Sequence, residues 1–158
     1  MSGAGIPEIT VGNMTGKRIW IVASSWHEQV MHGLIEGALR VIVEAGAIAE
    51  LHRVPGTFEL PLATQAAAKS GADAVVALGV VIRGGTPHFD YVCSAATDGL
   101  NRVALDTGVP IGFGVLTCDN EKQALDRAGL EGSVEDKGAE AATAAMSMVN
   151  VLGDIRSL

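Results

Sequence analysis

The chain has few of the residues that mark a disulfide-stapled or membrane-spanning protein. Only two of its 158 residues are cysteine. Cys93 and Cys118 stand alone, without Cys-x-x-Cys or Cys/His spacing, so we predict neither a disulfide framework nor a metal site. No apolar run reaches the ~20 residues of a membrane span, and the start, MSGAGIPEIT, lacks the basic flank and apolar core of a signal peptide. We therefore expect a cytoplasmic protein with no membrane partner.

Positive charge is also scarce. The chain has 11 Lys and Arg against 18 Asp and Glu, which gives a net charge of −7. Contact with a nucleic-acid backbone needs clustered Lys and Arg, so we predict no nucleic-acid partner. Any anionic ligand must then be held by a few local groups.

The length and the 48% hydrophobic content fit one globular domain. A chain of this size buries about 70% of its unfolded surface without staples. The first residues are rich in glycine and polar side chains. We therefore predict a flexible N-terminal arm over residues 1–16, ordered only against a neighbour, and a single domain over residues 17–158.

Short apolar runs alternate with longer segments of 3.6-residue period. Strands are expected at 18–23, 48–54, 75–82 and 111–116, and helices from the Ser25 cap to Gly46, at 58–69, at 87–106, from Asp119 to 127 and from Ser133 to 152. Alternating strands and helices are typical of parallel βαβ units. The predicted fold is a doubly wound α/β sandwich of three layers, with a four-stranded parallel sheet in the flavodoxin-like order 2-1-3-4.

Local capping signals are expected to begin three of these helices. Ser25-x-x-Glu28 and Ser133-x-x-Asp136 have the spacing of capping boxes, and Asp119 is placed to cap the short helix.

Ligands of such sheets bind outside the carboxyl ends of the strands. Polar, aromatic or glycine-rich segments are expected near this edge. They follow the first three predicted strands, at 26–27, 55–59 and 83–88, and lie in or after the fourth, at 113–119. Four segments that converge on one edge predict a ligand site there.

The segment Gly84-Gly85-Thr86-Pro87 joins the third strand to a helix. Thr86 is a good N-cap and proline is favoured at the first helical position. Glycines allow close backbone approach and a helix N-terminus attracts anions, so the loop can hold a phosphate. A tight turn without ligand explains the same residues, because the segment is no P-loop.

His88 would then stand beside a bound phosphate. Histidine exchanges protons near neutral pH, which suits a general acid or base. A solvated surface histidine is the alternative, and it is the favoured reading for His32 and His52.

Other candidates also have structural readings. Trp26 could stack on a planar ligand or cover the core, and Glu59 could bind substrate hydroxyls or complement the second helix. Arg127 at a helix end suits the helix dipole. Lys137 in the first turn of the last helix opposes the dipole, which hints at function.

Several ordered blocks carry a family resemblance. They are residues 24–27, 54–61, 79–92, 113–117, 127–129 and 136–138. With these blocks the sequence resembles the lumazine synthases, which make 6,7-dimethyl-8-ribityllumazine in the penultimate step of riboflavin biosynthesis. The resemblance implies a cofactor-free transferase that condenses 5-amino-6-(D-ribitylamino)uracil with 3,4-dihydroxy-2-butanone 4-phosphate and releases phosphate and water.

The resemblance also implies a role for each site residue. His88 would move protons; Gly85, Thr86 and Arg127 would hold the phosphate; Trp26 would stack on the pyrimidine; Thr57, Phe58 and Glu59 would engage the ribityl chain; and Val80, Val81 and Ile82 would line the ring pocket. Phe113, Arg127 and Lys137 would come from an adjacent subunit of a pentamer.

Two departures from the family bear on these expectations. His27 stands where many members carry asparagine, which leaves its role open. The stretch between Arg127 and Lys137 is about two residues longer than in members that form sixty-subunit icosahedral shells. In this family longer connections here accompany free pentamers, so the resemblance favours a free pentamer over the icosahedral shell.

Two rival functions fit the same fold. A binding module would hold a lumazine, flavin or phosphorylated ligand without turnover, and a shell protein would keep a vestigial pocket. The histidine beside the anion loop and the pair of Arg127 and Lys137 favour the enzyme.

Overall fold

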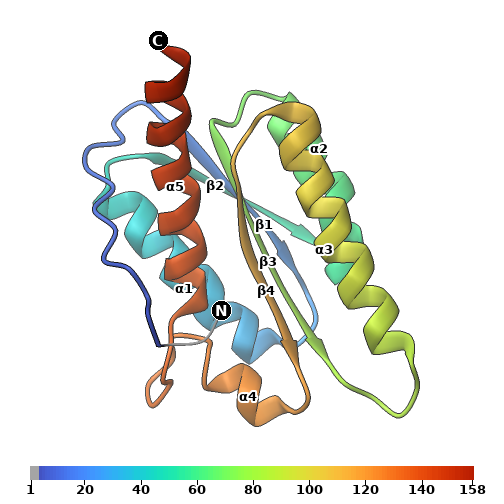
Figure 1. Cartoon of the computed structure of the whole chain (residues 1–158). Helices are drawn as coiled ribbons and strands as arrows, with labels where there is room; N and C mark the ends of the chain where they lie inside the picture. Colours follow the sequence, from blue (N-terminus) through green and yellow to red (C-terminus); the bar gives the residue numbers. More distant parts are fainter. Residues whose placement is uncertain (1–3) are drawn as a thin grey trace.

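The computed structural model describes residues 4–158, which form three layers (Figure 1). The strands are β1 (Arg18–Ser24), β2 (Ile48–Val54), β3 (Ala74–Ile82) and β4 (Ile111–Cys118). The helices are α1 (Glu28–Glu44), the 3-10 turn η1 (Thr57–Glu59), α2 (Leu60–Lys69), α3 (His88–Thr107), α4 (Glu121–Leu125) and α5 (Lys137–Arg156).

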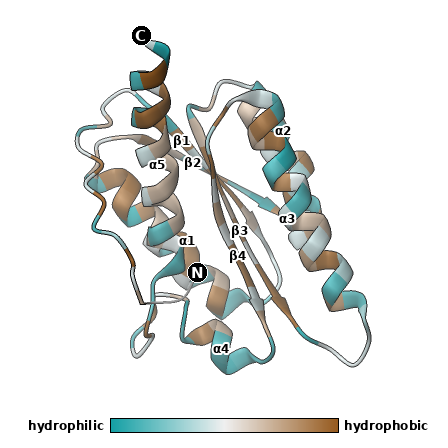
Figure 2. Cartoon of the chain, in the orientation of Figure 1, coloured by the Kyte–Doolittle hydropathy of each residue, from teal (hydrophilic) through white to brown (hydrophobic). Residues whose placement is uncertain are grey.

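The sheet is parallel throughout and its order is β2-β1-β3-β4, so the predicted fold and strand order are confirmed. β3 lies between β1 and β4 and is buried along most of its length. Figure 2 shows β3 and β4 as mainly hydrophobic strands between two layers of helices. This double burial explains why the sequence of β3 is continuously apolar and does not alternate.

The two faces of the sheet have separate cores. α1 and α5 cover one face around Ile21, Leu34 and Met146. α2 and α3 cover the other face around Val75 and Leu100. α1, α2 and α3 each connect one strand to the next by a crossover over one of these faces, as expected for parallel strands.

Small residues allow α5 to lie close to α1. A Cβ built on Gly138 would stand 2.0 Å from the carbonyl oxygen of Leu34, and one on Gly37 would stand 2.3 Å from the carboxylate of Asp136. Arg40 of α1 also binds Asp136 at 2.8 Å. The start of α5 is therefore fixed against the middle of α1.

The three predicted caps are wrong. His27 precedes α1, Asn120 caps α4 by accepting from Gln123 N, and Asp136 caps α5 by accepting from Ala139 N. Each predicted residue is engaged elsewhere: the Ser25 hydroxyl donates to Val54 O, the Ser133 hydroxyl donates to Leu125 O and Asp119 binds Arg83. Thr86 is not the N-cap of α3 either, because Pro87 occupies that position and α3 begins at His88.

Part of the predicted arm contacts the rest of the chain. Met14 is buried and its N–H donates to Ala45 O at 2.7 Å. The amide of Asn150 on α5 donates to Val11 O at 2.8 Å. The boundary at residue 16 and the flexibility of the arm stay predictions, and residues 1–3 lie outside the described residues.

The contact between α1 and α5 can be tested by a pair of glycine substitutions on α5. Gly138→Ala is expected to lower the free energy of unfolding by about 1–3 kcal/mol, because the methyl group forces the helices apart. Gly153 has no neighbouring atom within 4 Å of a built Cβ. Gly153→Ala should therefore raise the free energy of unfolding by about 0.5–1 kcal/mol, because alanine has a higher helix propensity than glycine. Urea unfolding of both variants measures the difference, and equal effects would contradict the close approach.

Candidate functional site

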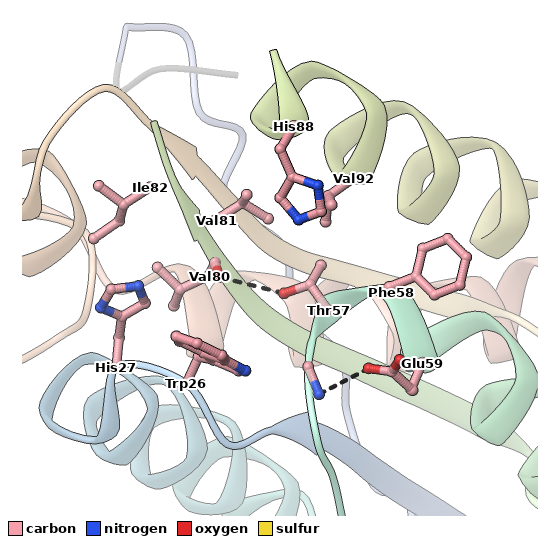
Figure 3. A pocket seen from close by; sticks show the side chains of 11 residues that line it. Trp26, His27, Thr57, Phe58, Glu59, Val80, Val81, Ile82, His88 and Val92 are labelled. Atoms are coloured by element: carbon pink, nitrogen blue, oxygen red, sulfur yellow. Dashed lines mark hydrogen bonds between the residues drawn. The ribbon is translucent and has the colours of Figure 1, made fainter. Parts of the chain in front are cut away.

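A cavity of about 580 Å³ lies at the carboxyl ends of β1, β2 and β3. Eight of the predicted site residues line it: Trp26, Thr57, Phe58, Glu59, Val80, Val81, Ile82 and His88. Figure 3 shows Trp26 and His27 on one side, His88 and Val92 on the other, and the end of β3 between them. The structure thus brings these eight residues together, and their individual roles stay predictions.

The turn after β1 carries Trp26 and His27. The Ser25 N–H and hydroxyl are hydrogen bonded to Pro55 O and Val54 O, which ties this turn to the end of β2. His27 has φ 58° and ψ 63°, the one positive φ among the non-glycine residues at 4–158. Such backbone strain clusters at functional sites. Trp26, the residue before His27, has 68% of its surface exposed and lines the cavity.

The η1 turn is fixed against β3 by Thr57. The buried Thr57 hydroxyl donates to Val80 O at 3.3 Å (Figure 3). A Cβ on Gly79 would lie 2.8 Å from that hydroxyl oxygen, so only glycine allows η1 this close to the strand. Glu59 accepts a hydrogen bond of 2.9 Å from Gly56 N. This contact matches the structural reading of Glu59, and its exposed carboxylate still borders the cavity.

The loop from β3 to α3 carries the predicted phosphate cradle. Gly85 and Thr86 are exposed and lie just before His88, which is in the first turn of α3. Neither Gly84 nor Gly85 has a positive φ, and neither has an atom within 4 Å of a built Cβ. Packing inside the described chain therefore does not explain these glycines, whereas close approach of a ligand would.

Phe113, Arg127 and Lys137 lie in a different place. They line a second cavity of about 550 Å³ between the exposed side of β4 and α5, and this cavity shares no lining residue with the first. Phe113 is the third residue of β4 and pairs with Ala77. It is therefore not at the carboxyl edge where the sequence reasoning placed it, because β4 begins only two residues before it.

The segment between α4 and α5 brings Arg127 and Lys137 together. Lys137 N donates to Arg127 O at 3.0 Å, and an antiparallel bridge joins Ala128 to Asp136. The Arg127 guanidinium donates to Gln123 O at 2.8 Å, the helix-end contact that the structural reading expected. Backbone contacts therefore hold Arg127 and Lys137 next to each other at the edge of β4.

Two carboxylates surround the Lys137 ammonium. It forms ion pairs with Glu135 and, at 2.7 Å, with Glu140. Burial lowers the pKa of Lys137, but the hydrogen bonds that its ammonium donates to Glu135 and Glu140 outweigh burial, so this pKa lies above its ordinary value. The hydrogen bond from Lys137 lowers the pKa of Glu135. These carboxylates also offset the misfit of a lysine at a helix N-terminus.

Three lining residues were not predicted to have a role: His27, Gly56 and Val92. Val92 follows His88 by four residues, so helical periodicity places both on one face of α3. Gly56 and His27 adjoin predicted residues, and the left-handed backbone of His27 has no sequence signal.

The described residues have neither a membrane span nor a metal cluster. No helix within residues 4–158 is long and apolar enough to cross a membrane. In the same range, no three His, Cys, Asp or Glu side chains gather as metal ligands would.

The fold and the cavity define a class of protein: a doubly wound α/β protein with a small-molecule site at the carboxyl ends of its strands. The sequence profile of the 6,7-dimethyl-8-ribityllumazine synthase family matches residues 16–153. The chain belongs to this family. The predictions of a lumazine synthase, of a transferase and of the condensation in riboflavin biosynthesis are confirmed at this level.

Individual relatives agree with the family match. A 6,7-dimethyl-8-ribityllumazine synthase of Leifsonia xyli subsp. xyli is 62% identical over 157 residues, which cover 99% of each chain. One from Kineococcus radiotolerans is 61% identical and covers 100% of this chain and 98% of its own. One from Streptomyces avermitilis is 58% identical, and the match covers 98% of this chain and 97% of that protein.

The ion pair of Glu135 and Lys137 predicts an acid-dependent loss of stability. Because the pKa of Glu135 is lowered by folding, its stabilisation is complete above the ordinary pKa of a glutamate and is lost as pH falls through the lowered pKa. Glu135→Gln should cost about 1.5–3 kcal/mol at neutral pH. Urea unfolding from neutral to acid pH should show that the difference in free energy of unfolding between Glu135→Gln and the wild type becomes smaller in acid. Glu131→Gln, in the exposed part of the same loop, is the control. A gap that is constant with pH would contradict the assignment.

Proposed function

We propose that the 580 Å³ cavity is the site where 5-amino-6-(D-ribitylamino)uracil condenses with 3,4-dihydroxy-2-butanone 4-phosphate, and that a second copy of the chain completes it. One observation carries this proposal. Apart from Gly85 and Thr86, which line neither, the predicted site residues line two cavities without a common residue. One cavity has Trp26 and His88, and the other has the two cations. One copy alone offers each substrate only part of its contacts.

In the proposed complex, the β4 edge of one copy faces the cavity of the next. Phe113 and Trp26 then enclose the pyrimidine, while Thr57, Phe58 and Glu59 border the ribityl chain. The half-exposed Phe113 is consistent with a residue that is covered by a partner. Repetition of such a head-to-tail contact closes a ring, and we favour the free pentamer.

The bond changes need no group from the protein beyond proton transfer and anion binding. The substrate amine attacks the ketone and loses water to give an imine. Removal of the proton from the carbon next to the imine expels phosphate and leaves an enol, which tautomerises to a ketone. The ribitylamino nitrogen adds to this ketone and closes the ring with loss of a second water. His88 moves the protons, and Gly85, Thr86 and Arg127 hold the phosphate as its charge develops.

Holding two substrates together supplies most of the rate in this scheme. Holding two reactants in the right geometry can lower the barrier by ~7–11 kcal/mol. Acid-base catalysis contributes a smaller factor to the rate. The shape of the cavity therefore matters more than any one side chain.

His88→Ala should reduce the rate of turnover without abolishing it. We expect kcat to fall by about 10²-fold, the lower end of acid-base contributions, while both KM values change little. Steady-state measurement of lumazine fluorescence and released phosphate gives these constants. His32→Ala, an exposed histidine of α1, is the matched control. An unchanged kcat in His88→Ala would remove the assigned proton role.

Arg127→Ala should raise KM for the phosphorylated substrate by about 10-fold to 10²-fold, because a hydrogen bond to a charged group contributes ~1.5–3 kcal/mol. Lys122→Ala on the nearby α4 is the control for loss of a positive charge. If the site spans two copies, a mixture of the His88→Ala and Arg127→Ala variants that is unfolded and refolded together should regain activity. About a quarter of the interfaces in the mixed assemblies then combine an intact His88 from one copy with an intact Arg127 from the other. No recovery in mixtures that co-assemble would place both residues in one copy.

Light scattering of the same samples gives the size of the assembly. Five copies of the 16.2 kDa chain have a mass of about 81 kDa. A megadalton particle would overturn the free pentamer in favour of the icosahedral shell.

A further inference from the structure

Arg83 makes contacts that the proposed mechanism does not use. It follows the last residue of β3, and its N–H donates to Cys118 O at 2.9 Å. The ladder between β3 and β4 thus continues for one residue beyond Ile82. The side chain of Arg83 then leaves the edge of the sheet toward two other segments.

One guanidinium joins these two segments. Nε of Arg83 lies 2.9 Å from Oδ1 of Asp119, which follows β4, and Nη1 lies 3.5 Å from Oδ1 of Asp90. Its central carbon stands 4.3 Å from the centre of the Phe89 ring. Phe89 and Asp90 belong to the first turn of α3, directly after His88. Arg83 therefore connects the end of β4 to the turn that carries the proposed acid-base group.

The backbone of the loop has few contacts of its own. Residues 83–88 are all exposed, and neither Gly84 nor Gly85 has a neighbouring atom within 4 Å of a built Cβ. Glycine pairs lose much conformational freedom when they are ordered. A side-chain contact at the start of this loop therefore contributes much of what holds the loop in one conformation. Figure 1 shows the loop between β3 and α3 at the same end of the sheet as α4.

We propose that Arg83 is a positioning residue for the condensation, which holds the phosphate loop and the first turn of α3 against the end of β4. This proposal rests on the proposed function. A planar guanidinium can bind two carboxylates and stack on a ring at the same time, which a lysine ammonium cannot do. The contacts therefore fix an orientation as well as a distance.

Exposure argues that these contacts serve orientation more than stability. The side chains of Arg83, Asp119 and Asp90 are 47%, 63% and 64% exposed. Ion pairs at such exposure are screened and stabilise the folded state little. Misplacement of a reacting group by about 1 Å, in contrast, can cost on the order of 10²-fold in rate.

Arg83→Ala should therefore separate activity from stability. We expect kcat/KM for the phosphorylated substrate to fall by about 10-fold to 10²-fold, while KM for the pyrimidine substrate and the unfolding midpoint stay near the wild type. Arg83→Lys should recover only part of the loss. Arg102→Ala is the control, because the exposed Arg102 also pairs with an aspartate of α3, Asp106, at 3.2 Å. That variant should keep wild-type kinetics.

A double-mutant cycle with Asp119→Asn distinguishes positioning from direct binding of phosphate by Arg83. If Arg83 acts through Asp119, Asp119→Asn alone lowers kcat/KM, and the double variant is no worse than Arg83→Ala. If Arg83→Ala lowers kcat/KM by the same factor in the wild type and in Asp119→Asn, the positioning role is overturned.

The activity of the wild type distinguishes failure of the Arg83 role from failure of the proposed function. An active wild type with unchanged kinetics in Arg83→Ala would overturn the role of Arg83 alone. A wild type that forms no lumazine and releases no phosphate would overturn the proposed function, and this role with it.

Discussion

The pairing of β3 with β1 on one side and β4 on the other is the interaction on which the rest of the structure depends. Because all these strands run in parallel, their carboxyl ends meet at one edge, and each crossover must return over a face of the sheet. The first cavity follows from this arrangement. Its walls are the chain segments that leave β1, β2 and β3, and the buried contact of Thr57 with Val80 keeps one wall against the central strand.

Much of the fold could be predicted from the sequence, because burial leaves a strong pattern. The apolar run of β3 and the alternation of strands with helices predict a parallel sheet with helices on both faces. The caps could not be predicted, because Ser25, Asp119 and Ser133 make contacts with residues that are distant in sequence or in neighbouring turns. A local signature is ambiguous when a tertiary partner competes for the same oxygen atom. Arg83 was given no role for the same reason, since its partners lie in the first turn of α3 and after β4.

The residues of the site could be predicted from the sequence, but their division into two groups followed only from the family resemblance. The residues of the first cavity follow strand ends and can be found from topology. Phe113 lies near the start of β4, and Arg127 and Lys137 meet at the antiparallel bridge between Ala128 and Asp136. The residue pattern alone does not separate this second group from the first. The family resemblance assigned it to an adjacent subunit, and in the structure it lines a different cavity.

The division of charge favours Arg127 over Lys137 as the phosphate ligand of the proposed site. In a chain with net charge −7, a bound anion needs a cation whose charge is not already balanced. Glu135 and Glu140 hold the Lys137 ammonium, and both would compete with a phosphate. The Arg127 guanidinium donates to a neutral carbonyl oxygen and has further donors in its planar fork, which suits two phosphate oxygens. Lys137 and its carboxylates would then hold the segment that presents Arg127, through the hydrogen bond from Lys137 N to Arg127 O.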